Sequence, residues 1–321
     1  MSDLVSGNKF LCVVAPAYNE ELGICEFINR VEQVIKTLDN TWTARLILVE
    51  DGSKDSTWEE ISKSEPSIHL TQIRFSRNFG HQTAVWAGIE NTRPAEYLVV
   101  MDSDLQDSPT EILTIVSQFD SGIDCVFMRR RSRQDSFFKR SFARSYYFLM
   151  KKLSSGVHME NVGDFYGLSP RAKNALLKNK ERVKYIRGLV SQLGYRVSFV
   201  EYDRDSRHSG KTNYTVAKMF SLAIAGVTGF SITPLLWTVY FAAIGSILSV
   251  SLVGYVLWLK IFGSAILQPG WAFLSVGTLL MSTFTLTSLA TISLYLSRIV
   301  QEVKQRPLFY IDEIKENFNN D

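Results

Sequence analysis

Two long stretches without charged residues lie near the C-terminus and constrain the fold of this chain more than any other feature. Met219–Leu259 and Ile261–Ser297 contain no Asp, Glu, Lys or Arg, and Lys260 alone separates them. Each stretch exceeds the ~20 apolar residues that a helix needs to cross the hydrocarbon core of a bilayer. The rest of the 321 residues has the composition of a soluble protein. We therefore expect a water-soluble domain followed by a hairpin of two membrane-spanning helices.

The charges beside the expected spans predict their orientation. Lys218 precedes the first span, whereas Arg298, Lys304 and Arg306 follow the second. Because positive residues stay on the cytoplasmic side, both termini and the soluble domain should be cytoplasmic. Three cysteines, an odd number without metal-ligand spacing, agree with reduced thiols in that compartment. The expected parts are a soluble domain (1–210), an interfacial juxtamembrane segment (211–230), two transmembrane helices (231–300) and a C-terminal tail (301–321).

The first two hundred residues alternate short apolar runs with helical patterns, which predicts a mostly parallel sheet with helices on both faces. The expected strands are Phe10–Ala15, Leu46–Val49, His69–Phe75, Tyr97–Met101 and Cys125–Met128. The expected helices are Glu20–Leu38, Ser56–Ser64, Gly80–Asn91 and Pro109–Phe119. In such sheets, ligands bind beyond the carboxyl ends of the strands.

Acidic residues follow three of these expected strands. The first strand runs into Pro16–Glu20, the second into Glu50–Ser53 and the fourth into Asp102–Asp104. A turn after a strand lets the two carboxylates of an Asp-x-Asp motif approach one site. Such oxygen ligands suit Mg²⁺ or Mn²⁺, which are commonly held by one or two carboxylates together with substrate phosphates. The pattern therefore predicts a metal and diphosphate site at one edge of the sheet, where a cation would stabilise a departing diphosphate.

Several linked motifs resemble those of glycosyltransferase family 2, and within it the polyprenyl-phosphate glycosyltransferases. This group includes the bactoprenol glucosyltransferases, the aminoarabinose transferase and dolichol-phosphate mannose synthase. The likeness covers almost the whole chain. The motifs that carry it are Val14–Glu21, Val49–Thr57, Ser76–Ala84, Met101–Pro109, Gly163–Phe165, Arg204–Thr212 and Tyr295–Arg298.

The resemblance implies a fold and an activity. The fold would be a GT-A-type (Rossmann-like) domain followed by the two-helix transmembrane hairpin. The activity would be metal-dependent, inverting transfer of glucose or a related hexose from a nucleotide diphosphate sugar, with UDP favoured. The acceptor would be polyprenyl (undecaprenyl) phosphate at the cytoplasmic face of the inner membrane. Related enzymes further suggest a homo-oligomer, such as a tetramer.

The resemblance also implies roles for individual residues. Those expected to hold the base and ribose of the nucleotide are Pro16, Tyr18, Glu20, Val49 and Asp51. Those expected at the metal and diphosphate are Asp102, Ser103, Asp104 and Gln106. We expect Asp104 to be a direct metal ligand and Asp102 to share the ion. Arg130 and Arg207 match arginines near substrate phosphates. The planar, permanently charged guanidinium group is well suited to binding a phosphate.

Asp164 matches the aspartate that is usually proposed as catalytic base or as a group that positions the acceptor. The acceptor phosphate is a monoester whose second pKa is near 6, so it is already largely ionised at neutral pH. Such a nucleophile scarcely needs a base. Orientation of a neighbouring arginine or of a sugar hydroxyl is the favoured role, with the base role and a purely structural role as alternatives.

Three departures from the family pattern leave the donor sugar open. Asn213 stands where a phosphate-binding lysine is expected, and Lys211 is the candidate replacement. Tyr166 follows Gly163–Phe165 where the glucosyltransferases have arginine, and Gln192 is near a position where tryptophan is common. These changes lie where the acceptor or the sugar would be recognised.

Two other classes of function compete with this reading. A processive polysaccharide synthase of the same family would carry a Gln-x-x-Arg-Trp string, which this sequence lacks. A non-enzymatic sugar-nucleotide sensor would not need the Asp-Ser-Asp motif, and a flippase component would need more than two uncharged helices as a translocation path. Nucleic acid is an improbable partner for a chain with bilayer spans.

Overall fold

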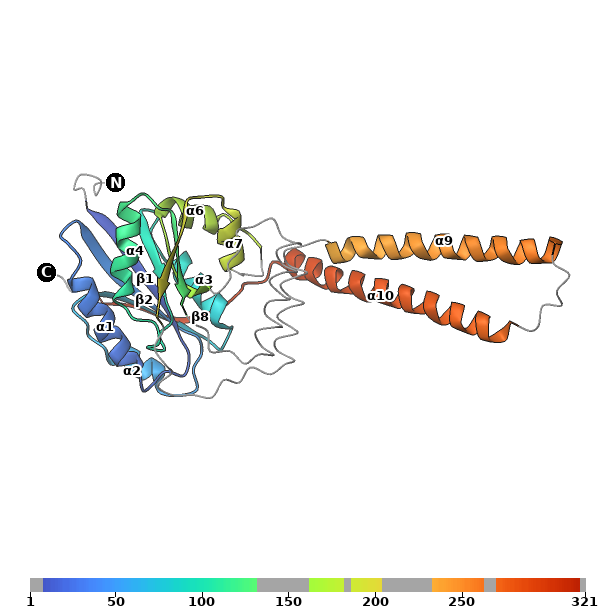
Figure 1. Ribbon diagram of the computed structural model, residues 1–321. Coiled ribbons are helices and arrows are strands. Elements are labelled where there is room, and N and C mark those ends of the chain that lie inside the picture. The colour runs from blue at the N-terminus through green and yellow to red at the C-terminus, as the bar shows by residue number, and fades with distance from the viewer. Residues whose placement is uncertain (1–7, 132–161, 182–185, 204–232, 263–269, 318–321) are drawn as a thin grey trace. The chain divides into compact units, whose positions relative to one another are not determined.

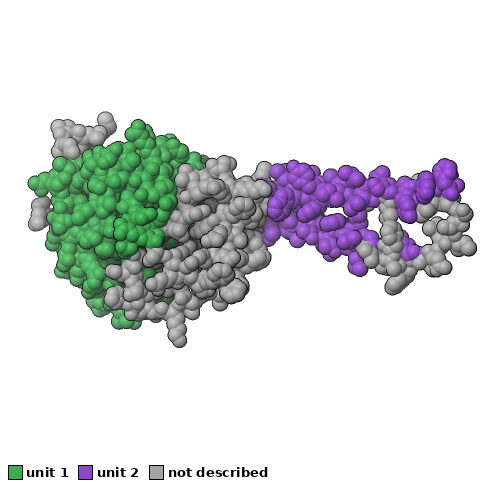
Figure 2. Space-filling model, in the orientation of Figure 1, with its two compact units in different colours: residues 1–147, 155–213, 306–321 green, residues 148–154, 214–305 purple. Residues whose placement is uncertain are grey.

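The computed structural model describes residues 8–131, 162–181, 186–203, 233–262 and 270–317. The chain forms two compact units (Figure 2). Unit 1 comprises Met1–Tyr147, Ser155–Asn213 and Arg306–Asp321, and unit 2 comprises Phe148–Ser154 and Tyr214–Gln305. The C-terminal residues therefore belong to the same unit as the N-terminal ones.

An eight-stranded mixed sheet forms the centre of unit 1 (Figure 1). The strands are β1 (Lys9–Ala17), β2 (Trp42–Glu50), β3 (His69–Phe75), β4 (Glu96–Val100), β5 (Cys125–Arg130), β6 (Val162–Leu168), β7 (Val197–Tyr202) and β8 (Ile311–Asn317). Their order across the sheet is β7-β5-β6-β4-β1-β2-β3-β8. The central strands are nearly continuous apolar runs because both faces of the sheet are covered.

Helices cover both faces and enclose two hydrophobic cores. They are α1 (Ile24–Lys36), α2 (Thr57–Lys63), α3 (His81–Glu90), α4 (Glu111–Asp120), α6 (Pro170–Leu177) and α7 (Ile186–Gln192). Buried side chains of α1, α2 and α4 pack in one core, and those of α3, α6 and α7 pack in the other. Gly88 lets α3 lie close to the sheet, because a Cβ there would be 2.3 Å from Val14 Cγ1.

The structure confirms all five expected strands and all four expected helices, with shifts at their ends. It also contains elements that the sequence pattern did not predict: β6, β7, β8, α6 and α7. Both β6 and β8 are antiparallel to their neighbours, so the sheet is mixed where a mostly parallel one was expected. Residues 301–321 were expected to form a tail, yet Ile311–Asn317 pairs with β3 as an edge strand of the sheet.

Unit 2 contains two long antiparallel helices, α9 (Thr233–Phe262) and α10 (Trp271–Lys304) (Figure 1). Phe241 stacks on Phe284 with ring centroids 5.9 Å apart, and a Cβ on Gly245 would lie 3.6 Å from Met281 Sδ. Within the described residues, Gly277–Lys304 is long and apolar enough to cross a membrane, whereas the apolar stretch Leu235–Leu248 of α9 is shorter. By length and composition, the structure supports one membrane-crossing segment where the sequence predicted two.

Candidate active site

The candidate site lies where the carboxyl end of β4 meets the first residues of β6 and the N-terminus of α3. Strand β6 runs antiparallel to β4, with Val100 opposite Tyr166. The start of β6 therefore lies beside the end of β4, which brings Asp164 towards Asp102. The helix α3 begins at the same edge and supplies His81.

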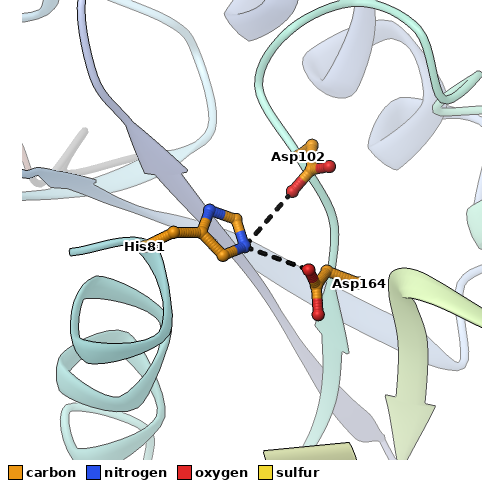
Figure 3. Close-up of side chains that lie close together, drawn as sticks. All are labelled: His81, Asp102 and Asp164. Carbon is orange, nitrogen blue, oxygen red and sulfur yellow. Dashed lines mark ion pairs between the residues drawn. The ribbon is translucent and has the colours of Figure 1, made fainter. Parts of the chain in front are cut away.

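His81 bridges the two carboxylates (Figure 3). Its Nε2 lies 3.5 Å from Asp102 Oδ1 and 3.4 Å from Asp164 Oδ2. One potential ligand atom from each of the three residues lies within 4.8 Å of the other two. Burial by itself would favour a neutral imidazole, but the contact with Asp164 and the charge of Asp102 raise the pKa of His81. The cluster therefore favours a positive charge between its carboxylates.

Asp164 accepts contacts from three side chains. Besides His81, Arg187 Nε lies 3.2 Å and Gln82 Nε2 lies 3.1 Å from Asp164 Oδ1. Burial opposes ionisation, yet the His81 contact and the charge of Arg187 hold the pKa of Asp164 well below its ordinary range. A carboxylate with so low a pKa is a poor proton acceptor near neutral pH. This environment suits a positioning group better than a general base.

Asp102 has the opposite electrostatic environment. Burial, together with the charges of Asp164, Asp107 and Asp104, raises the pKa of Asp102 to about 6, although His81 lowers it. A bound cation would favour the ionised form of Asp102. The donors are carboxylate oxygens, which Mg²⁺ and Mn²⁺ prefer, so the residues present fit a hard divalent ion.

Asp104 is half-buried in the turn after β4 and lies outside the three-residue cluster. Its Oδ1 accepts the backbone N–H of Gln106 at 3.2 Å. Leu105 between them has a φ of 59°, in the left-handed region. A non-glycine residue rarely adopts this conformation, and functional sites are enriched in such positions. The turn thus keeps Asp104 outside the three-residue cluster, while its charge still acts on Asp102.

Asp51 organises a neighbouring loop. It is 2% exposed, and its carboxylate accepts hydrogen bonds from Phe79 N (2.7 Å), Gly80 N (2.9 Å) and Asn78 Nδ2 (3.1 Å). Burial outweighs these bonds and raises the pKa of Asp51. Gly52 is required here, because its φ is 62° and a Cβ would lie 2.2 Å from the carbonyl carbon of Arg77. Asp51 therefore fixes the path of the chain that leads to His81.

The residues predicted to hold the nucleotide differ in their accessibility. Five of them are buried, namely Pro16, Val49, Asp51, Ser103 and Gln106. Ser103 Oγ donates to the backbone carbonyl of Pro16 at 2.8 Å, which ties the end of β4 to the end of β1. Tyr18 is 40% exposed and Glu20 is half-buried. Among these residues, Tyr18 and Glu20 have side chains that a ligand could reach.

Arg130 extends from the end of β5 over the backbone of Gly163, where a Cβ would lie 3.2 Å from its NH2. Glycine at this position lets a guanidinium approach the residue next to Asp164. Arg207 and Lys211, the other two predicted phosphate contacts, lie outside the described residues.

Three residues in contact with Asp164 had no role assigned from the sequence: His81, Gln82 and Arg187. His81 and Gln82 belong to the motif Ser76–Ala84 at the start of an expected helix, which was a usable signal. Arg187 was visible only as half of an Arg-Gly pair, and nothing in the pattern connected it with Asp164.

Comparison with known proteins decides the family. The family described as Glycosyl transferase family 2 matches residues 12–187, more than half of the chain. The chain belongs to glycosyltransferase family 2. The family match runs from β1 into α7 and includes the whole cluster around Asp164.

Relatives of this family-2 glycosyltransferase match it over nearly their full length. An uncharacterized glycosyltransferase of Bacillus subtilis (strain 168), YkcC, is 35% identical over 94% of this chain and 93% of its own. The prophage bactoprenol glucosyl transferase homolog of Escherichia coli (strain K12) is 30% identical over 95% of this chain and 99% of its own. Among solved structures, glucosyl-3-phosphoglycerate synthase from Mycobacterium tuberculosis, with Mn²⁺ and UDP-glucose, shares 18% identity and a TM-score of 0.46 over 69% of this chain and 77% of that one.

Proposed function

We propose that this family-2 glycosyltransferase moves one sugar, glucose or a related hexose, from a UDP-linked donor to a polyprenyl phosphate. The observation that carries the proposal is the gathering of Asp102, Asp164 and two cationic side chains, His81 and Arg187, at one edge of the sheet. An oxygen-rich, cation-lined site suits a reaction between a diphosphate and a phosphate. Near-full-length similarity to a bactoprenol glucosyl transferase homolog supports a lipid acceptor.

The reaction we propose is a direct displacement. A phosphate oxygen of the lipid attacks the anomeric carbon, the bond from that carbon to the diphosphate breaks, and the configuration inverts. A bound Mg²⁺ or Mn²⁺ would neutralise the charge that develops on the leaving diphosphate. Asp104 and Asp102 would hold that ion.

The remaining residues bind and orient the two substrates. Tyr18 and Glu20 would contact the nucleotide, because their side chains are accessible at the end of β1. Arg130 would contact a substrate phosphate, and we keep the same prediction for Arg207. Asp164 would orient Arg187 towards the acceptor phosphate. Its low pKa and the ionised state of the acceptor both argue against a base.

Membrane attachment is part of the proposal. We propose that both α9 and α10 cross the inner membrane, so that the lipid acceptor and unit 1 share its cytoplasmic side. The apolar side chains that α9 and α10 expose support this arrangement, since such surface is unfavourable in water. Examples are Val239, Ile247 and Val250 of α9, and Leu274, Leu279 and Leu286 of α10.

The test is an extraction assay with the purified full-length protein in detergent. It contains undecaprenyl phosphate, Mg²⁺ or Mn²⁺ and a panel of labelled nucleotide sugars. We expect label to enter the organic phase with at least one UDP-sugar, and Asp104→Asn to abolish the transfer. Asp203→Asn is the control, because Asp203 is exposed and pairs only with Arg131 among the described residues. Donor binding without lipid-linked label would favour a sensor, and equal activity of Asp104→Asn would refute the metal role.

A further inference from the structure

The loop between β3 and α3, residues 76–80, connects two parts of the candidate site. At one end, the backbone N–H groups of Phe79 and Gly80 bind Asp51. At the other, the loop leads directly into His81, which contacts Asp102 and Asp164. The conformation of the 76–80 loop therefore sets both the donor-side wall and the carboxylate cluster.

The C-terminal segment of the chain holds this loop from outside. The backbone N–H of Ser76 donates to the carbonyl of Tyr310 at 3.0 Å. Phe309 stacks on Phe75, the last residue of β3, with ring centroids 4.9 Å apart and an interplanar angle of 16°. Tyr310 contacts Phe79 with a centroid distance of 6.1 Å. The end of β3 and two residues of the loop, Ser76 and Phe79, thus contact two residues of the C-terminal segment.

The pairing of β8 with β3 changes register at this point. The two strands pair regularly from Leu70 to Arg74, and the register shifts between Arg74 and Phe75, where Ile311 becomes the partner. The extra residue, Asp312, lies in β8, so the irregularity bends β8 beside Phe309 and Tyr310. It lies where these two residues contact the end of β3 and the 76–80 loop.

We propose that Phe309 and Tyr310 are positioning residues for the sugar nucleotide, acting through the 76–80 loop on Asp51 and His81. Only residues 305–310 separate the end of α10 from β8. Two residues of this short connection, Phe309 and Tyr310, would therefore contribute to the donor site. This inference rests on the proposed function, because it assumes that the donor binds beside Asp51.

The side chains involved allow a test without loss of the fold. Tyr310 is 55% exposed, and Tyr310→Ala keeps the backbone carbonyl that accepts from Ser76. Phe309→Leu is a second variant that keeps an apolar side chain but loses the stacked ring. Ile314→Ala is the matched control, because Ile314 lies in the adjoining strand β8, is 47% exposed and pairs with Ile73, away from the loop.

The experiment measures UDP affinity by calorimetry, and the KM for the donor and the kcat, all with the full-length protein in detergent. An aromatic contact is worth roughly a 2- to 10-fold change in an equilibrium. We expect the Kd for UDP and the donor KM to rise by about that factor in Tyr310→Ala and Phe309→Leu, with kcat within about twofold of the wild type. Tyr310→Phe should restore both constants, and Ile314→Ala should leave them unchanged.

The outcomes separate this inference from the proposed function. Unchanged UDP affinity and donor KM in both variants would overturn the positioning role, whatever happens to thermal stability. An equal rise in Ile314→Ala would overturn it too, because it would mark a general effect of strand β8. If the wild type binds UDP but makes no lipid-linked sugar, the proposed function fails while the binding measurements still test the inference.

Discussion

Replacement of Asp51 by asparagine tests how a buried carboxylate builds the donor side of the site. The substitution keeps the shape of the side chain but leaves one oxygen for the two backbone N–H groups of Phe79 and Gly80, and directs an NH₂ group at the other. Loss of one charge-assisted hydrogen bond in a buried site costs about 1.5–3 kcal/mol. Burial of a neutral amide is easier than burial of a carboxylate, whose pKa is raised here, and this offsets part of the loss. The expected net destabilisation is about 1–3 kcal/mol.

Thermal unfolding of the purified protein in detergent measures this effect. For a domain of about 200 residues, 1 kcal/mol corresponds to roughly 2–4 °C, so Asp51→Asn should lower Tm by about 2–12 °C. The donor KM should rise as well, because the 76–80 loop loses an anchor. Asp203→Asn removes a carboxylate whose side chain is 73% exposed and should shift Tm by less than about 2 °C. An unchanged or higher Tm in Asp51→Asn would refute the reasoning, since desolvation would then outweigh the hydrogen bonds.

Three further substitutions test the site and the core. Asp164→Asn should lower kcat by about 10- to 100-fold, as expected for a group that orients another, with a pH–rate profile of unchanged shape; a lost limb in that profile would identify a base. Gly167→Ala should destabilise by about 1–3 kcal/mol in denaturant unfolding, because its Cβ would lie 2.3 Å from Ile115 Cγ2, and a neutral result would mean that the helix moves freely. Glu96→Gln should cost about 2–4 kcal/mol by the same measurement, because it breaks a buried pair in which Arg45 Nε lies 2.7 Å from Glu96 Oε1; a stabilised variant would contradict this.

The parts of the fold that follow from the sequence are those with strong apolar patterns. β1 to β5 and the helices between them contain continuous aliphatic runs or clear helical spacing. In α1, the buried residues recur three and four positions apart, as on one face of a helix. Because these strands could be predicted, the acidic residues that follow them could be assigned to strand ends, and the position of Asp102 could be predicted.

The elements that the sequence did not reveal have local reasons for a weak pattern. In β6, Gly163 makes room for Arg130, and Gly167 makes room for Ile115 and Phe119. Close packing therefore requires glycine at two positions where a strand would normally show larger apolar residues. In β8, four of the seven residues are charged, and the partly buried positions are Glu313, Lys315 and Asn317. Such polar edge strands protect a sheet against pairing with other chains and look like surface tails in a sequence.

The cluster around Asp164 could be predicted only in part for the same kind of reason. Asp164 and Asp102 were identified by their motifs, but their proximity depends on the antiparallel direction of β6. Arg187 comes from a short helix that contains a glycine and gives little helical signal. Contacts of this kind depend on tertiary structure, which no local pattern encodes.

Mass spectrometry of the lipid fraction after reaction tests the central claim most directly. Undecaprenyl phosphate and the active UDP-sugar, incubated with the wild-type protein, should give a lipid whose mass has increased by a single sugar, and Asp104→Asn should leave the lipid unmodified. A ladder of products with several sugars, or release of UDP and free sugar with the lipid unchanged, would contradict the transfer of one sugar to a lipid phosphate.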